Sequence, residues 1–242
     1  MLIAENIAKL EERIQKACDS AGRSRNEITL MGITKFVPVK KIKEAFCCGI
    51  YCFGESRVKE AAEKLAVFRE EHSGTRIDLV GSLQRNKAKQ AAVFFDCIQS
   101  VDRDELILDL IKHSALRDKP LSVLLELHTG EETKSGFAAN SGSDFDSLYR
   151  AAELILSCSN LKPAGLMTMA PFTTDEELIR SSFRQLVKAQ KELKKRFPTA
   201  SPAVEGAENW SVLSMGMSND FEIAIEEGSN LLRVGSAIFK EQ

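Results

Sequence analysis

The sequence contains little that would mark a membrane, secreted or nucleic-acid-binding protein. No segment approaches the roughly 20 apolar residues that a membrane-spanning helix needs, and residues 1–6 lack the basic start and apolar stretch of a signal peptide. The formal net charge is −2, so there is no basic excess of the kind that nucleic-acid binding usually leaves. We therefore expect a cytoplasmic protein that binds neither nucleic acid nor membranes.

Paired CxxC spacing is also absent, although the chain has six cysteines. The cysteines fall in apolar contexts, and in a reducing compartment we interpret them as small core residues. Cys47, Cys48 and Cys52 are close enough in sequence for a metal or redox site, but no histidine lies near them. We therefore expect no metal site.

What the sequence does contain is a regular alternation of two kinds of segment. Short apolar runs are candidate strands at 28–34, 50–53, 77–80, 97–101, 121–127, 164–169, 211–214 and 231–234. Amphipathic, charge-rich segments between them predict helices at 39–48, 56–72, 83–94, 103–117, 143–158, 175–196 and 219–227. Residues 2–22 come before the first strand and have helical spacing, with Gly22 at the expected helix end.

This alternation predicts an α/β fold, namely a single (β/α)8 TIM-type barrel with an extra N-terminal helix. Barrels of this kind typically have about 250 residues, and no compositional break or linker divides the 242 residues, so we expect one domain over 1–242. A doubly wound open sheet is the competing arrangement. The strand count and the lack of a dinucleotide-binding fingerprint favour the barrel.

Polar residues follow the predicted strands, at the end where a barrel carries its active site. The first strand is apolar on both faces and ends at Lys35. The segments 226–230 and 233–236 contain Gly and Ser, and together with Ser214 they could cradle a phosphate. The alternative is that their glycines only shape turns. A lysine near such a cradle either pairs with an anionic substrate or forms a Schiff base with a carbonyl, as in pyridoxal phosphate (PLP) proteins.

Eight sequence blocks then point to a known family. They are GITKFVP (32–38), FGES (53–56), VGSLQRNKAK (80–89), SVDR (100–103), GEETKSGF (130–137), GLMTMAP (165–171), LSMGMSNDFEIAI (213–225) and GSNLLRVGSAIF (228–239). In this order, and over nearly the whole chain, they resemble the YggS/PROSC family of PLP homeostasis proteins. The resemblance implies a PLP-binding barrel similar to the barrel half of alanine racemases.

The resemblance also implies roles for individual residues. Lys35 takes the position of the Schiff-base lysine, and Arg233 takes that of an arginine near the cofactor, at its ring nitrogen or its phosphate. The phosphate-cradling blocks hold Ser214, Ser229, Asn230, Gly235 and Ser236, and the FGES block adds Ser56 as a further cofactor-binding candidate. The chain departs from the family at Ser56 (usually Asn), Asp78 (in place of an aromatic–His pair), Asn219 (Asp) and Asn230 (Thr).

Family members are regarded as carriers or regulators of vitamin B6 and amino-acid pools without established turnover, so we expect a monomeric PLP carrier with apo PLP-dependent enzymes as recipients and no catalytic residues. Racemisation needs a base on each face of the cofactor. Alanine racemases take one from a tyrosine of a second domain, which we do not expect here because the sequence ends at Gln242. Tyr51 and Tyr149 are not at predicted strand ends.

Two other functions stay open at this point. One is a small PLP-dependent enzyme such as an amino-acid racemase, and the other is a phosphosugar isomerase in which Lys35 pairs with the phosphate. Lys134, after the fifth predicted strand, could hold a second PLP or pair with a substrate carboxylate, or it could be an ordinary solvated lysine beside Glu131 and Glu132.

Overall fold

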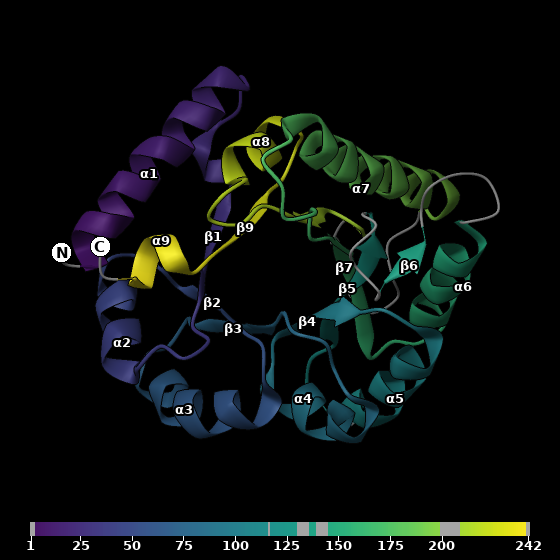
Figure 1. Cartoon of the computed structure of the whole chain (residues 1–242). Helices are drawn as coiled ribbons and strands as arrows, with labels where there is room; N and C mark the ends of the chain where they lie inside the picture. Colours follow the sequence, from purple (N-terminus) through teal and green to yellow (C-terminus); the bar gives the residue numbers. More distant parts are fainter. Residues whose placement is uncertain (1–2, 116, 130–135, 139–144, 199–208, 241–242) are drawn as a thin grey trace.

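A closed ring of parallel strands forms the centre of the molecule. The computed structural model describes residues 3–115, 117–129, 136–138, 145–198 and 209–240. The ring contains β1 (Thr29–Ile33), β2 (Cys52–Glu55), β3 (Arg76–Leu79), β4 (Cys97–Val101), β5 (Leu121–His128), β7 (Leu161–Met167), β8 (Val212–Ser214) and β9 (Leu231–Val234). Each strand pairs with its neighbours in this order, and β9 pairs with β1 to close the ring (Figure 1).

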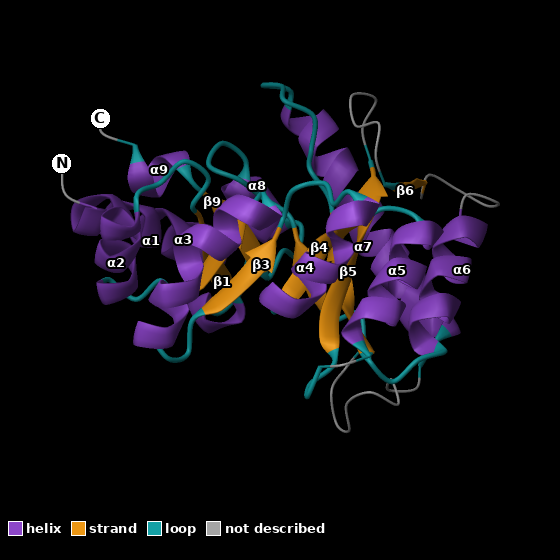
Figure 2. Ribbon diagram, turned by 90° about the horizontal axis from the view of Figure 1, so that it is seen from below, coloured by secondary structure: helices purple, strands orange, loops and turns teal. Residues whose placement is uncertain are grey.

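Helices surround this ring on the outside, as Figure 2 shows from a second direction. They are α2 (Val39–Cys47), α3 (Val58–Glu71), α4 (Ala88–Phe94), α5 (Asp104–Ser114), α6 (Phe145–Leu156), α7 (Glu176–Arg196), α8 (Phe221–Glu226) and α9 (Ser236–Phe239). The predicted (β/α)8 barrel is therefore confirmed. The doubly wound alternative is wrong because an open sheet has no pairing between its first and last strands.

The extra N-terminal helix is confirmed as α1 (Ile3–Ser20). It buries one apolar face, which includes Ile7, Leu10 and Ile14, as the helical spacing predicts. The chain leaves the helix through Gly22, whose φ of +64° is the left-handed conformation that suits glycine. α1 lies beside α9, and the side chain of Asn6 donates to the backbone oxygen of Ile238 at 3.0 Å.

Several predicted boundaries differ from the structure, and β7 begins three residues earlier than expected. β2 begins two residues later than expected, and its Gly54 is tightly enclosed, because a Cβ there would lie 2.6 Å from Ile33. The helix expected over 83–94 begins only at Ala88, after a 3₁₀ turn. Between the strand predicted at 121–127 and the helix predicted at 143–158, the structure contains a two-residue strand that was not expected, β6 (Phe137–Ala138), which pairs with β5 outside the ring.

Five of the six cysteines fall into two groups, and the sixth, Cys158, is partly buried. Cys18, Cys52 and Cys97 are buried, as predicted, and burial raises the pKa of each thiol. The core assignment is wrong for Cys47 and Cys48, which are exposed. Cys47 is the last residue of α2 and Cys48 follows it, whereas the buried residues of α2 are Ile42 and Ala45.

Within the residues that the structure describes, no helix combines the length and the apolar character needed to cross a membrane.

Candidate functional site

The candidate site lies where the parallel strands end, at the rim that we call the mouth of the barrel. Lys35 comes two residues after β1 and its side chain is exposed. Arg233 lies on β9, which is paired directly with β1, so both residues belong to one side of the barrel. Ser236 follows two residues after the end of β9. Three of the predicted site positions, with an amine, a guanidinium and a hydroxyl, therefore lie on or just after two paired strands.

The backbone before Lys35 is held firmly by the residue Thr34, which is fully buried. Its hydroxyl donates to Glu55 Oε1 at 2.6 Å, and its backbone oxygen accepts from Lys64 Nζ at 2.7 Å. Lys64 also forms an ion pair with Glu55, with Nζ and Oε1 2.5 Å apart. The end of β1 is thereby fixed to the end of β2 and to α3. The FGES block was noted from the sequence, but Glu55 and Lys64 were missed as the residues that hold the segment carrying Lys35.

Phe36, which follows Lys35, has a φ of +62°, a strained conformation for a bulky residue. Its ring is 68% exposed, so burial does not explain the strain. Lys35 Nζ lies 5.1 Å from the ring centroid, and the guanidinium carbon of Arg57 lies 5.3 Å from it. The sharp turn therefore places an aromatic face beside the amine of Lys35.

Arg233 is the buried cation of the site, with only 5% of its surface exposed. Its Nη1 donates to Ser214 Oγ at 2.7 Å and its Nη2 to the backbone oxygen of Thr168 at 2.7 Å. Burial lowers the pKa of Arg233 to about 10, against the opposing effect of Asp220 and Glu126. The guanidinium therefore stays charged at neutral pH.

A pair of hydroxyl groups forms the part of the mouth that is suited to an anion. Ser236 Oγ donates to Ser218 Oγ at 2.9 Å, and this pair is exposed. Gly216, in the loop that carries Ser218, has a φ of +97°, and a Cβ on it would lie 2.6 Å from Ala224 Cβ. Gly235 is also close to the barrel wall, since its Cβ would lie 3.2 Å from Ile33 Cβ. Sequence reasoning missed Ser218, although the LSMGMS block contains it.

Three predicted phosphate ligands use their polar atoms inside the protein instead. Ser214 Oγ is bonded to Arg233 and to Gln99. The hydroxyl of Ser229 is buried and donates to the backbone oxygen of Met215 at 2.7 Å. Asn230 bonds the backbone of Ser211 and Leu213 at 2.9 and 2.8 Å, which holds β8 against β9.

The two remaining sequence predictions have different outcomes. Ser56 is half-buried and lies against Gly81, where a Cβ would come within 2.4 Å of the Ser56 backbone oxygen. Its role at the cofactor stays a prediction. Lys134 lies outside the described residues.

Comparison with known proteins agrees with this fold. The family model described as the alanine racemase N-terminal domain matches residues 5–242. A pyridoxal phosphate homeostasis protein of Aquifex aeolicus is 36% identical over 100% of this chain and 99% of its own length. The structure of PipY of Synechococcus elongatus with PLP bound superposes with a TM-score of 0.80 at 26% identity, covering 98% of this chain and 99% of PipY.

An alanine racemase of Bacillus anthracis is a more distant structural neighbour. It is 14% identical, with a TM-score of 0.66, and the match covers 99% of this chain and 56% of the racemase. At this identity the likeness shows the barrel fold alone.

Proposed function

Because the chain belongs to the family of pyridoxal phosphate homeostasis proteins, which is built on the alanine racemase N-terminal domain, we propose that it carries PLP at the barrel mouth. Its role is that of a carrier and regulator in intracellular PLP and amino-acid homeostasis. The observation that supports this most strongly is the exposed amine of Lys35, which stands on a fixed backbone beside the strand that carries Arg233.

The groups at the mouth fit PLP by their chemistry. In this proposal Lys35 Nζ would bind the aldehyde covalently, and we assign Arg233 to the ring nitrogen rather than to the phosphate. Ser218 and Ser236 supply hydroxyl donors for the phosphate, beside the backbone of Gly235. When bound, the cofactor supplies an aldehyde that combines reversibly with amines and a ring that withdraws electrons. A guanidinium at the ring nitrogen keeps that nitrogen unprotonated and weakens the withdrawal, which suits storage better than turnover.

The positions of the two tyrosines also favour a carrier over a racemase. Tyr51 lies just before β2, at the opposite end of the barrel from the mouth, and is 56% exposed. Tyr149 lies in α6, where its hydroxyl is 3.5 Å from Glu192. Neither tyrosine is placed to act as the base that racemisation needs on the second face of the cofactor.

Borohydride trapping tests the proposed site. Purified protein is mixed with PLP and reduced, and the modified peptide is identified by mass spectrometry. We expect one dominant adduct on Lys35, which disappears in Lys35→Ala and is retained in Lys40→Ala, a control at another exposed lysine. An unmodified Lys35 in the presence of PLP would reject the proposal and return the phosphosugar isomerase to consideration.

The carrier role has its own test. We propose a cytoplasmic monomer that delivers PLP to apo PLP-dependent enzymes, so loaded protein should restore the activity of an added apo-enzyme. Lys35→Ala protein treated in the same way should not. Sustained interconversion of amino-acid enantiomers over many turnovers would instead support the racemase alternative.

A further inference from the structure

A chain of hydrogen bonds runs through the interior of the barrel and ends at Arg233. Arg233 Nη1 donates to Ser214 Oγ, Ser214 Oγ donates to Gln99 Oε1 at 2.7 Å, and Gln99 Nε2 donates to Asp78 Oδ2 at 2.7 Å. Asp78, Gln99 and Ser214 have no exposed surface. These hydrogen bonds therefore link β3, β4, β8 and β9 without intervening solvent.

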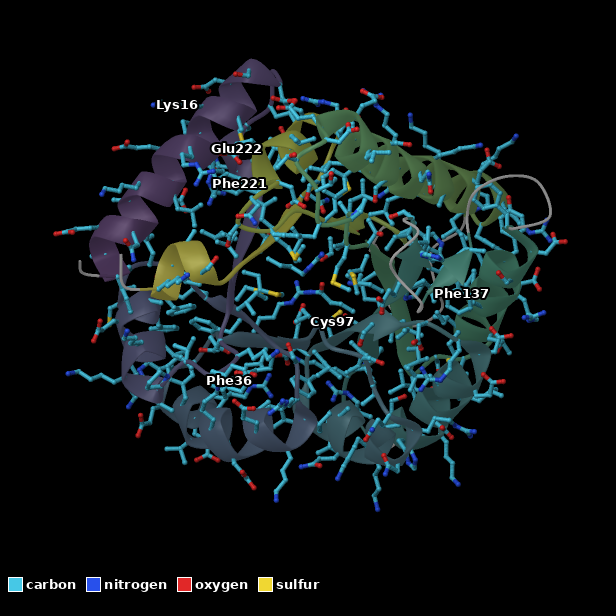
Figure 3. The ribbon with its side chains drawn as sticks, viewed as in Figure 1. Lys16, Phe36, Cys97, Phe137, Phe221 and Glu222 are labelled. Carbon is cyan, nitrogen blue, oxygen red and sulfur yellow. The ribbon has the colours of Figure 1, made fainter. Side chains whose placement is uncertain are left out.

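The surroundings of this chain are otherwise apolar. The inward face of the strands includes Met31, Cys52, Cys97, Leu124 and Leu231. Figure 3 shows Cys97 inside the ring of strands, and Gln99 is two residues further along β4 and so points to the same side. Buried polar groups in such a place are costly unless they are bonded. Because each member of this series is hydrogen-bonded to the next, the series fixes the orientation of its last member, Arg233.

Asp78 determines which group is the donor and which the acceptor in this series of hydrogen bonds. Three N–H donors converge on its carboxylate, from Arg76 Nε at 2.8 Å, from Arg76 Nη2 at 2.7 Å and from Gln99 Nε2. Only the ionised carboxylate accepts all three, because a protonated carboxyl would present a hydrogen to a donor. Asp78 is therefore an acceptor toward Gln99, and the amide of Gln99 has one possible orientation.

The remaining bonds follow from that orientation. Gln99 presents its oxygen to Ser214, so the serine hydroxyl donates its single hydrogen to Gln99. The lone pairs of Ser214 are then left to accept from Arg233 Nη1, while Nη2 is held by the backbone of Thr168. Two of the five guanidinium hydrogens are thus fixed toward the barrel wall, and the plane of the guanidinium is set.

We propose that Asp78 and Gln99 are positioning residues that orient Arg233 toward the ring nitrogen of PLP. This inference rests on the proposed function, since it concerns the cofactor at the same mouth. Neither residue touches the cofactor, and both act through Ser214. Arg76, at the other end of the chain, lines a pocket of about 280 Å³ at the opposite opening of the barrel, so the chain spans the barrel from that opening to the mouth.

Three variants test the proposal at different links. Asp78→Asn keeps the shape but adds donors, so the amides of residues 78 and 99 can reverse and direct an N–H at Ser214. Gln99→Met breaks the chain with a side chain of similar length, and Ser214→Ala removes only the last link. Ser114→Ala is the control, because Ser114 is a fully buried hydroxyl on α5 that bonds Leu110 and Asn160, outside this chain.

The measurement is the visible absorption of bound PLP as a function of pH, together with the dissociation constant. We expect all three chain variants to shift the apparent pKa of the bound chromophore by about one unit and to weaken PLP binding by about tenfold. We also expect Gln99→Met and Ser214→Ala combined to shift it no further than one alone, because both break the same chain. The control should match the wild type.

The outcomes separate the two proposals. Wild-type spectra and titrations in folded Gln99→Met and Ser214→Ala proteins would overturn the positioning role and leave PLP binding intact. Failure of the wild type to take up PLP would overturn the proposed function and this inference with it. If Asp78→Asn does not fold, the other two variants decide, because neither leaves Arg76 without its carboxylate.

Discussion

Thr34 Oγ1 and Glu55 Oε1 are hydrogen-bonded at 2.6 Å, and both side chains are completely buried. This bond joins the ends of two neighbouring strands, one residue before Lys35. The second carboxylate oxygen, Glu55 Oε2, is buried without a hydrogen-bond partner among the described residues. Among the described residues the Glu55 carboxylate is therefore held through Oε1 alone. Removal of the Thr34 hydroxyl should weaken the contacts that fix the backbone before Lys35.

Replacing Thr34 by valine should be strongly destabilising for this reason. The variant keeps the shape but leaves Glu55 with less hydrogen bonding, and we expect a loss of about 1–3 kcal/mol in the free energy of unfolding. Urea denaturation measures the loss, and Thr174→Val at an exposed position is the control. We also expect slower trapping of PLP on Lys35. Equal stability of the two valine variants would contradict the anchoring role.

Phe36 provides a test of backbone strain. Glycine adopts positive φ without penalty, whereas alanine keeps the Cβ that causes the strain. Since the ring is largely exposed, we expect Phe36→Gly to be more stable than Phe36→Ala by about 1 kcal/mol. Thermal unfolding of both variants at the same pH gives the comparison. The reverse order would mean that residue 36 is not held in the left-handed region in solution.

Thiol reactivity should follow burial. Cys47 and Cys48 are exposed, whereas burial raises the pKa of Cys52 and Cys97 and leaves little thiolate at pH 8. We expect iodoacetamide to modify the first two in the native protein and the other two only after unfolding, with peptide mass spectrometry as the readout. Rapid native modification of Cys97 would contradict the closed barrel interior.

The stability of the folded protein should depend on pH through Asp220. Burial raises the pKa of this carboxyl, partly offset by a bond from the backbone N–H of Met217 and by Arg233. Between its unfolded pKa of about 3.9 and its raised folded pKa, the folded state binds more protons, so this group's contribution falls as pH rises.

The variant Asp220→Asn removes that titration while it keeps a side-chain oxygen for the Met217 N–H. We expect the difference in unfolding free energy, variant minus wild type, to increase as pH rises from about 4 through the folded pKa. Urea denaturation over a pH series measures it, with Asp118→Asn at the surface as a control. A difference that does not change with pH would show that the pKa of Asp220 is not raised.

Much of the fold was predictable because strands and helices have different apolar periods. The β4 segment was located correctly at 97–101, and α7 to within one residue at its start. The start of β2 was misplaced because Ile50 and Tyr51 continue the apolar run, while Gly54 and Glu55 have low strand propensity. Packing between neighbouring strands decided that boundary, and no local pattern contains it.

The candidate site was predictable in part. Lys35 follows β1 and Arg233 lies on β9, at positions that the pattern and the resemblance both indicated. Ser218 and Glu55 were missed because their importance depends on partners from distant segments. Asp78 was noted only as a departure from the family, although a carboxylate inside a predicted strand implies a buried partner, and Gln99 inside the next strand was the available signal.

The pairing of β9 with β1 has a consequence for synthesis on the ribosome. β1 stands near the start of the sequence and β9 near its end, and the ring closes only when they meet. During translation Lys35 leaves the exit tunnel long before Arg233, so a nascent chain presents the amine without the cation that completes the mouth. The capacity to hold the cofactor therefore arises only after β9 has been synthesised, together with closure of the barrel.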